Sequence, residues 1–237
     1  MILKNKSKEN YIDESPLEYW MSFSDMMSSL LMIFILLLIL SILQLSRQKE
    51  LLIEKEDEVD KIIGIRQMIV AELREEFRDS QLEIDIDPET GSITFSEGVL
   101  FDYNAYIIKD TGKDYLMEFI PQYIKVLLNP KNKEYISEII IEGHTDDQGS
   151  YMYNLELSQK RAFEVAKFIL SEEFQGLGNK EDLQSILTAN GRSFSNPIRD
   201  SEGNIIDESS RRVEFKFRLK DEEMIYKMKE MLEDGDA

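Results

Sequence analysis

The sequence contains no cysteine, so disulfide bonds and thiolate metal sites are excluded. Its single histidine, His144, excludes the usual multi-histidine metal sites and disfavours a serine–histidine–acid hydrolase. Basic residues are also scarce, because 28 lysines and arginines face 47 acids and the formal net charge is −19. This charge argues against nucleic acid as a main partner. The acidic loops at 146–149 and 200–203 lack the ligand spacing of an EF-hand, so we expect neither a metal nor a cofactor.

A long apolar run at residues 20–45 dominates the N-terminal part of the chain. A helix needs roughly 20 apolar residues to cross a bilayer, and this run is long enough. It is too long for the apolar core of a cleaved signal and has no small-residue cleavage site. We therefore predict a retained transmembrane helix.

Asp25 is the only charged residue in this run. A carboxylate in a membrane helix costs roughly 2.5–3.5 kcal/mol, so it is rare without a function. Ser22, Ser28 and Ser29 lie three or four residues from Asp25 and share its helix face. Two interpretations stay open. Asp25 is either an ion-carrying acid with the three hydroxyls as accessory groups on the ion path, or an interfacial acid near Trp20 that lipid headgroups keep wet.

The charges on either side of the run do not indicate which end of the helix faces the cytoplasm. Three lysines precede the run, and one arginine and two lysines follow it closely, so the positive charges are balanced. Residues 1–19 are predicted to be a short polar segment. Residues 46–80 are rich in charge and have apolar positions at helical spacing, which predicts a juxtamembrane helical linker. This linker either pairs with a second copy as a coiled coil or packs on the following domain.

Residues 81–220 switch to a mixture of strand and helix patterns. Strands that alternate with helices predict an α/β (α+β) domain with helices on a mixed sheet. Pro121 is expected to bend or break the first of these helices, and residues 221–237 are predicted to be an acidic tail. The predicted strands are 82–86, 92–95, 138–142 and 212–219, the last closing the sheet with one exposed face, and the predicted helices are 112–128, 151–172 and 181–189.

A polar loop between a strand and a helix forms the second candidate site. Asp146 lies in the loop, and Asn154, Ser158 and Arg161 fall on one stripe of the helix that follows. A carboxylate and a guanidinium that face one cleft suit a ligand with an ammonium and a carboxylate at the same end. The alternative is an internal salt bridge between Asp146 and Arg161 that fastens the loop to the helix, and this is the commoner outcome for such a pair.

The membrane run carries a family resemblance. Its motif is Trp20-x-x-Phe23-x-Asp25-Met26-Met27 followed by apolar residues. This motif resembles the single membrane helix of the ion-driven stator subunits MotB, ExbD and TolR, in which the matching acid takes up and releases the ion. The resemblance implies that Asp25 carries the ion, and it adds a third interpretation of residues 46–80, a plug that blocks the ion path. Both H⁺ and Na⁺ suit a lone carboxylate, and the absence of further acids in the helix favours H⁺.

A second resemblance covers the domain at 81–220. Its motifs are Gly143-x-Thr145-Asp146-x-x-Gly149, Asn154-x-x-Leu157-Ser158-x-x-Arg161-Ala162, Gly191 with Pro197, and Arg211-Arg212-Val213-Glu214. These motifs are similar to the OmpA-like peptidoglycan-binding domain, a βαβαβ sandwich. The resemblance implies that Asp146 and Arg161 bind the diaminopimelate of the cell-wall peptide. It also implies that Asn154, Tyr153, Leu157 and Arg212 belong to this site. Ser210 departs from the Asn that the family often has before the last motif, which weakens the inference for that edge.

The combination of the two parts is the MotB architecture, and the run 147–158 and the stretch 101–104 resemble the ZorB family of the Zorya anti-phage defence system. The resemblance implies a stator that is not an enzyme and that is anchored to peptidoglycan. It implies a homodimer inside a ring of a multi-helix MotA/ZorA-like subunit. It further implies a single-pass protein of the bacterial inner membrane, with a cytoplasmic N-terminus and a periplasmic C-terminal domain. The alternatives are a flagellar MotB-type stator and a passive wall tether of the Pal or OmpA kind.

Overall fold

The computed structural model describes residues 16–80, 82, 84–178 and 180–220. The expectations for residues 1–15 and for the acidic tail at 221–237 lie outside these residues. The chain divides into two compact units, residues 1–57 and 58–237.

A single helix, α1 (Pro16–Phe77), contains the predicted membrane span and most of the predicted linker without a break between them. In the first unit, residues 23–54 are exposed all around the helix. By length and composition, this helix contains a stretch that is apolar enough to cross a membrane. A helix satisfies all its backbone hydrogen bonds internally, and apolar side chains on every side fit it to a lipid environment.

The last turns of α1, from residue 58 onward, belong to the second unit. Ile69, Leu73 and Phe77 are buried in the core of this unit. The Phe77 ring stacks on Phe119, with ring centroids 5.4 Å apart. This packing favours the second interpretation of the linker for its C-terminal part, which lies against the domain.

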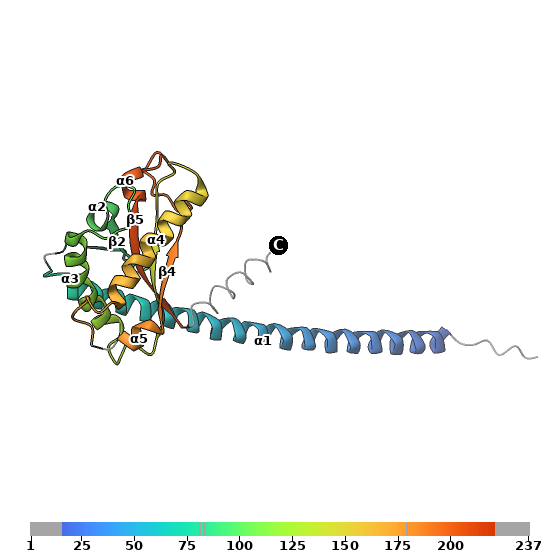
Figure 1. The fold of residues 1–237 in the computed structure, drawn as a ribbon. Coiled ribbons are helices and arrows are strands. Elements are labelled where there is room, and N and C mark those ends of the chain that lie inside the picture. The colour runs from blue at the N-terminus through green and yellow to red at the C-terminus, as the bar shows by residue number, and fades with distance from the viewer. Residues whose placement is uncertain (1–15, 81, 83, 179, 221–237) are drawn as a thin grey trace, which may run out of the picture. The chain divides into compact units, whose positions relative to one another are not determined.

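The second unit is built on a five-stranded sheet with the order β1-β2-β5-β3-β4 (Figure 1). The parallel pair, β3 and β4, is joined through α4, which gives a βαβ crossover, and the other neighbours are antiparallel. The strands are β1 (Asp85–Ile86), β2 (Ile93–Ser96), β3 (Ile136–Gly143), β4 (Leu187–Gly191) and β5 (Arg212–Leu219).

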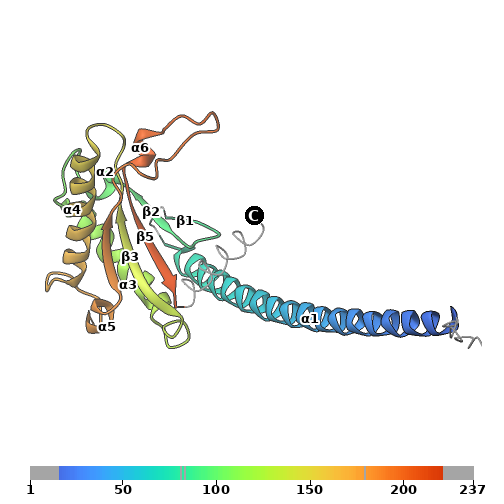
Figure 2. The same ribbon diagram turned by 90° about the vertical axis from the view of Figure 1, so that its right-hand side faces the viewer.

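Two long helices, α3 (Asp110–Leu127) and α4 (Tyr151–Leu170), cover one face of the sheet (Figure 2). On this face the buried rings of Phe95, Phe119 and Phe215 meet edge to face, at centroid distances of 4.8–5.5 Å. Three short helices complete the unit: α2 (Glu97–Leu100), α5 (Lys180–Gln184) and α6 (Asp207–Ser210). The predicted fold class, an α/β (α+β) domain behind one N-terminal apolar helix, is confirmed.

Pro121 does not break α3, because buried residues on both sides of the proline hold the helix against the core. Two other details of the prediction were wrong. The stretch 181–189 is not one helix, since α5 ends at Gln184 and β4 begins at Leu187. Strand β5 does not close the sheet with an exposed face. It lies at the centre between β2 and β3, and most of its side chains are buried.

Two glycines allow α4 to lie directly on the ends of the parallel strands. A Cβ atom at Gly143 would come within 2.2 Å of the Ser158 carbonyl oxygen, and one at Gly191 within 2.5 Å of the Gln159 nitrogen. Side chains at these two positions would therefore push the helix away. The close approach places the middle of α4 beside the end of β3, where the predicted polar loop begins.

The free edge of β4 is covered by one side chain of α4. Gln159 donates from Nε2 to the carbonyl of Ala189 (3.0 Å) and accepts at Oε1 from the N–H of Gly191 (2.7 Å). These backbone groups do not take part in the pairing of β4 with β3, and an uncovered edge would leave them open to water or to another strand.

Candidate functional site

A small pocket lies at the end of the sheet where β3 stops and α4 begins. Its volume is about 40 Å³. We call it the charged pocket, and its lining comes from α2, from the loop after α2, from the β3–α4 loop, from α4 and from the residue before β5. The lining residues are Glu97, Tyr103, Asn104, Thr145, Asp146, Gln148, Tyr153, Asn154, Leu157, Arg161 and Arg211.

The β3–α4 loop is fixed by local hydrogen bonds that follow from its polar sequence. Asp146 Oδ1 accepts from the N–H of Gln148 (3.2 Å), and the Gln148 carbonyl accepts from Asn154 Nδ2 (2.9 Å). The Ser150 hydroxyl caps α4 by accepting from the N–H of Tyr153 (3.3 Å). Asn154 therefore holds the loop that carries Asp146, in addition to lining the pocket.

Arg161 is held in a buried ion pair with Glu97. Its Nη2 contacts Glu97 Oε1, and its Nε donates to the carbonyl of Ala105 at 2.8 Å. Only 2% of the Arg161 surface is exposed. Burial lowers the pKa of Arg161 from its ordinary value and the charge of Glu97 opposes this, so the guanidinium keeps its charge.

Arg211 bridges the two acids of the pocket. Its Nη1 lies 2.6 Å from Asp146 Oδ2, and its Nε lies 2.9 Å from Glu97 Oε2. The hydrogen bond to Asp146 raises the pKa of Arg211 against the effect of burial. Asp146 and Arg161 thus pair with Arg211 and Glu97 and not with each other, so the predicted internal salt bridge is replaced by a chain of four charges.

The four charges sum to zero and all lie at the same pocket. A ligand that brings one ammonium and one carboxylate can exchange with these ion pairs without leaving a net charge behind. An anion or a cation alone would leave one buried group unpaired, at a cost of several kcal/mol. The geometry therefore favours a zwitterionic group.

The comparison of sequences identifies the family. The OmpA family model matches residues 100–209. The Zorya protein ZorB of Escherichia coli O139:H28 is 28% identical over 223 residues, which are 90% of this chain and 87% of that protein. The ZorB of Escherichia coli strain Crooks is 30% identical over 210 residues, 84% of this chain and 87% of that protein. The chain belongs to the ZorB family.

Solved structures give a third comparison for this ZorB-family chain. A putative MotB-like protein from Desulfovibrio vulgaris has a TM-score of 0.49 and 20% identity, over 67% of this chain and 94% of the other. The cell wall anchor of the type VI secretion system from Pseudomonas aeruginosa has a TM-score of 0.42 and 21% identity, over 65% and 99%. The predicted resemblance to ZorB and to an OmpA-like domain is confirmed by the sequence relatives and the family model.

The structure brings together five of the six residues predicted for the peptidoglycan site. Asp146, Tyr153, Asn154, Leu157 and Arg161 all line the charged pocket. Sequence reasoning missed two charged residues of the pocket. Arg211 stood in the quoted Arg-Arg motif but its neighbour was chosen, and Glu97 carried no signal because only the fold brings α2 beside α4.

Arg212 points to the other face of the sheet, away from the charged pocket. Consecutive residues of a strand alternate between faces, so only one of the paired arginines can reach the pocket. Arg212 Nε lies 2.5 Å from Glu214 Oε1, and its Nη2 donates to the carbonyl of Asn196 at 3.1 Å. Its role in this ZorB-family chain is to hold the loop after β4 against the sheet.

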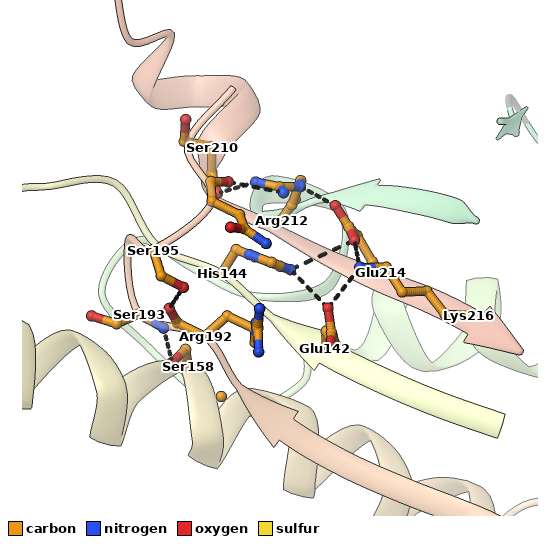
Figure 3. A network of polar contacts seen from close by, with 12 residues as sticks. Glu142, His144, Ser158, Arg192, Ser193, Ser195, Ser210, Arg212, Glu214 and Lys216 are labelled. Carbon is orange, nitrogen blue, oxygen red and sulfur yellow. Dashed lines mark hydrogen bonds and ion pairs between the residues drawn. The ribbon is translucent and has the colours of Figure 1, made fainter. Parts of the chain in front are cut away.

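Arg212 belongs to what we call the sheet-face cluster, Glu142, His144, Arg212, Glu214 and Lys216 (Figure 3). His144 is the first residue after β3, and its ring is 1% exposed and points between two carboxylates, so it belongs to this cluster and does not line the charged pocket. Its Nε2 lies 3.6 Å from both Glu142 Oε2 and Glu214 Oε2, which is long for a hydrogen bond.

The donor atoms of Glu142, His144 and Glu214 lie within 4.8 Å of one another, a spacing that suits a metal ion. However, Lys216 Nζ lies 2.6 Å from Glu142 Oε2 and 2.5 Å from Glu214 Oε2. Its ammonium therefore supplies the positive charge that the two carboxylates need. We assign no metal to the sheet-face cluster.

The sheet-face cluster predicts a loss of stability in acid. The pKa of Glu142 is lowered to about 2 by the neighbouring His144 ring and by Lys216, against burial. Burial alone would raise the pKa of Glu214, but His144 and Lys216 lower it overall. A carboxylate with a lowered pKa stabilises the fold above its unfolded pKa and loses this effect as the pH falls. Stability should therefore fall between about pH 4.5 and pH 2.

Thermal unfolding of the full chain in detergent, followed by near-ultraviolet circular dichroism, measures this effect. Replacing Lys216 with Met should lower stability at pH 7, because Glu142 and Glu214 lose their counter-ion. The difference in thermal stability between the wild type and the Lys216→Met variant should become smaller as the carboxylates become protonated. If this difference in stability stayed constant from pH 6 to pH 2.5, Lys216 would not be the counter-ion of Glu142 and Glu214.

In the membrane run, the predicted accessory hydroxyls bond to the helix itself. Ser28 Oγ donates to the Ser24 carbonyl (2.8 Å), and Ser29 Oγ donates to the Met26 carbonyl (2.9 Å). Ser22 lies in α1, but its side chain is outside the described residues. Asp25 is exposed on the helix surface, where a partner subunit can reach it.

Proposed function

We propose that this protein is the peptidoglycan-anchored stator subunit of a Zorya anti-phage defence motor. Its C-terminal domain holds the cell wall through the charged pocket, and its membrane helix carries an ion through Asp25. The observation that carries the wall-binding part is the neutral set of four charges, Glu97, Asp146, Arg161 and Arg211, at one pocket of an OmpA-family domain.

The ligand of the pocket is the zwitterionic end of diaminopimelate in the cell-wall peptide. Its ammonium takes the place of the Arg211 guanidinium at Asp146, and its carboxylate is gripped by the arginines. Arg161 is fixed by Glu97 and by the Ala105 carbonyl, so it presents its remaining N–H donors from a constant position. Leu157 supplies apolar contact for the aliphatic chain.

Arg211 acts as a latch on the pocket. A volume of about 40 Å³ holds a water molecule or two and is too small for the end of an amino acid. The side chain of Arg211 is 24% exposed, whereas that of Arg161 is 2% exposed, so Arg211 is the arginine that can swing outward. Binding therefore begins when the ligand ammonium displaces Arg211 from Asp146.

Replacing Arg211 with Gln tests whether the neutral charge of the pocket selects a zwitterion. The pocket charge falls from zero to minus one, so the variant should favour a diamine over the zwitterion. We expect the preference for meso-diaminopimelate over 1,5-diaminopentane to fall about tenfold, which corresponds to about 1.4 kcal/mol. The measurement is competition by the two compounds against binding of the full chain, in detergent, to purified peptidoglycan.

Arg218 supplies the matched control for this experiment. It is an arginine on β5, but it pairs with Glu138 and lies outside the charged pocket. Replacing Arg218 with Gln should leave the preference unchanged. The wall-binding proposal would be refuted if the wild-type protein bound neither compound and did not sediment with peptidoglycan.

In the membrane, Asp25 is alternately charged and neutralised as an ion, preferably a proton, passes. One helix with one acid cannot form a channel by itself. We therefore propose a second copy of the chain and a surrounding ring of a ZorA-like multi-helix subunit, in which the change of charge alters helix packing. We further propose the inner membrane as the location, with residues 1–19 in the cytoplasm and the OmpA-like domain in the periplasm. A domain that is bound to the cell wall keeps this subunit stationary while the surrounding ring moves.

A further inference from the structure

The loop at residues 102–107, which we call the rim loop, presents three large apolar side chains to solvent beside the charged pocket. Tyr103 is 76% exposed, Tyr106 is 39% exposed and Ile107 is 72% exposed. Exposed aromatic residues gathered beside a pocket usually mark a binding surface. The rim loop begins beyond Phe101, which forms an isolated antiparallel bridge with Ile108, so its two ends are held together.

The rim loop is tied to the charged pocket by hydrogen bonds. Asn104 has a positive φ of 59°, an uncommon conformation for a residue other than glycine. Its backbone N–H donates to Glu97 Oε1 (3.3 Å), and its Oδ1 accepts from the hydroxyl of Tyr153 (2.7 Å). The Ala105 carbonyl accepts from Arg161. The loop is therefore rigid, and a rigid exposed aromatic surface loses little entropy when it binds.

A cation lies against each of the two tyrosine rings. Lys160 Nζ is 5.2 Å from the centroid of Tyr106, and the Arg211 guanidinium carbon is 5.8 Å from the centroid of Tyr103. The contact with Lys160 holds the orientation of the Tyr106 ring while the ring surface stays exposed. Tyr153 lines the pocket from α4, is 49% exposed, and reaches the rim loop through its hydroxyl, which donates to Asn104.

We propose that the aromatic rim, Tyr103, Tyr106 and Tyr153, binds a sugar ring of the glycan strand that carries the peptide. A pyranose has an apolar C–H face, which suits the negative face of an aromatic ring, and hydroxyl groups at its edge. The hydroxyls of Tyr103 and Tyr106 can pair with them, and so can the Lys160 ammonium, which also contacts Glu156 at 2.6 Å. This inference rests on the proposed function, because the sugar arrives with the peptide in the pocket.

The reach of the cell-wall peptide agrees with this placement. The diamino acid is separated from the sugar by two residues of the peptide and a lactyl group, which together span more than about 7 Å of extended chain. Tyr103 and Tyr153 line the pocket itself, so the rim begins at the pocket mouth. A ligand that fills the charged pocket therefore brings its sugar to the rim loop.

The test compares two probes on the full chain in detergent by isothermal titration calorimetry. One probe is the free stem peptide with diaminopimelate, and the other is the same peptide attached to its disaccharide. We expect the disaccharide to tighten binding of the wild type about tenfold. Replacing Tyr106 with Ala should reduce this ratio to about twofold, whereas Tyr106→Phe should keep most of it because the ring remains.

Phe163 provides the control, since it is an exposed aromatic residue on α4 that does not line the pocket. Phe163→Ala should leave the ratio unchanged. Equal affinity of the wild type for the two probes would overturn the glycan site while leaving the peptide pocket standing. No binding of the stem peptide would overturn the proposed function itself. A change of oligomeric state in Tyr106→Ala, seen by analytical ultracentrifugation, would identify the rim as a contact between copies and would also overturn the inference.

Discussion

Replacing Asp25 with Asn is expected to abolish phage defence, reducing protection to the level of cells that lack the system. Asparagine has nearly the same size and polarity as aspartate but cannot gain or lose a proton or neutralise a cation. A carboxylate in an apolar helix costs roughly 2.5–3.5 kcal/mol, so Asn should make insertion easier. Loss of protection would then come from lost ion coupling and not from failed insertion. Plaque counts in cells with the complete system measure the effect.

Four companion measurements separate the motor from a passive tether. The Asp25→Asn protein should still fractionate with the inner membrane and still bind purified peptidoglycan. Asp25→Glu keeps the carboxylate and should retain part of the protection. Ser28→Ala should have a small effect, because this hydroxyl is already bonded to the Ser24 carbonyl. Full protection by Asp25→Asn would refute the motor and leave the tether as the explanation.

The second large effect is expected from Arg161→Ala, which should remove wall binding and destabilise the domain. The substitution leaves Glu97 with Arg211 as its remaining charged partner and leaves the Ala105 carbonyl without its donor. Removing one partner of a buried ion pair costs about 3–5 kcal/mol of stability. Binding should weaken by about 2–5 kcal/mol, which is at least a thirtyfold loss.

Lost binding and lost stability can be separated by a more conservative variant. Arg161→Lys keeps the charge beside Glu97 but loses the planar pair of donors that grips a carboxylate. It should lose most wall binding in a sedimentation assay while the thermal unfolding of the full chain changes less than in Arg161→Ala. Lys167→Ala, at an exposed position of α4 paired with Glu164, is the control. Undiminished sedimentation of Arg161→Lys and Arg161→Ala would remove Arg161 from the site.

The sequence was most informative where one physical pattern dominated. The alternation in Arg212–Leu219 predicted β5 at its observed bounds, and the apolar run predicted the N-terminal helix. Strand β4 was missed because it is only five residues long, LTANG, and contains alanine, asparagine and glycine, which are depleted in strands. Its position comes from pairing with β3 and from the cover of α4, both of which are tertiary effects.

The residues of the charged pocket also divide into those that local sequence patterns predict and those that only the tertiary fold brings together. Asp146, Asn154 and Arg161 lie in one loop and one helix, so local spacing could place them on one cleft. Glu97 lies 64 residues before Arg161, and only the folded sheet brings them together. The strand alternation at Arg211 and Arg212 did contain the information that one of them faces away. Deciding which one required the register of β5 against β3.

The side chain of Gln159 on the β4 edge has a consequence for assembly. It occupies the Ala189 carbonyl and the Gly191 N–H, the outward-facing groups to which an added strand would have to bond. A neighbouring copy held close by the same wall or the same motor therefore finds no template for sheet extension at this edge. Neighbouring copies therefore do not join their sheets at Ala189 and Gly191 of β4.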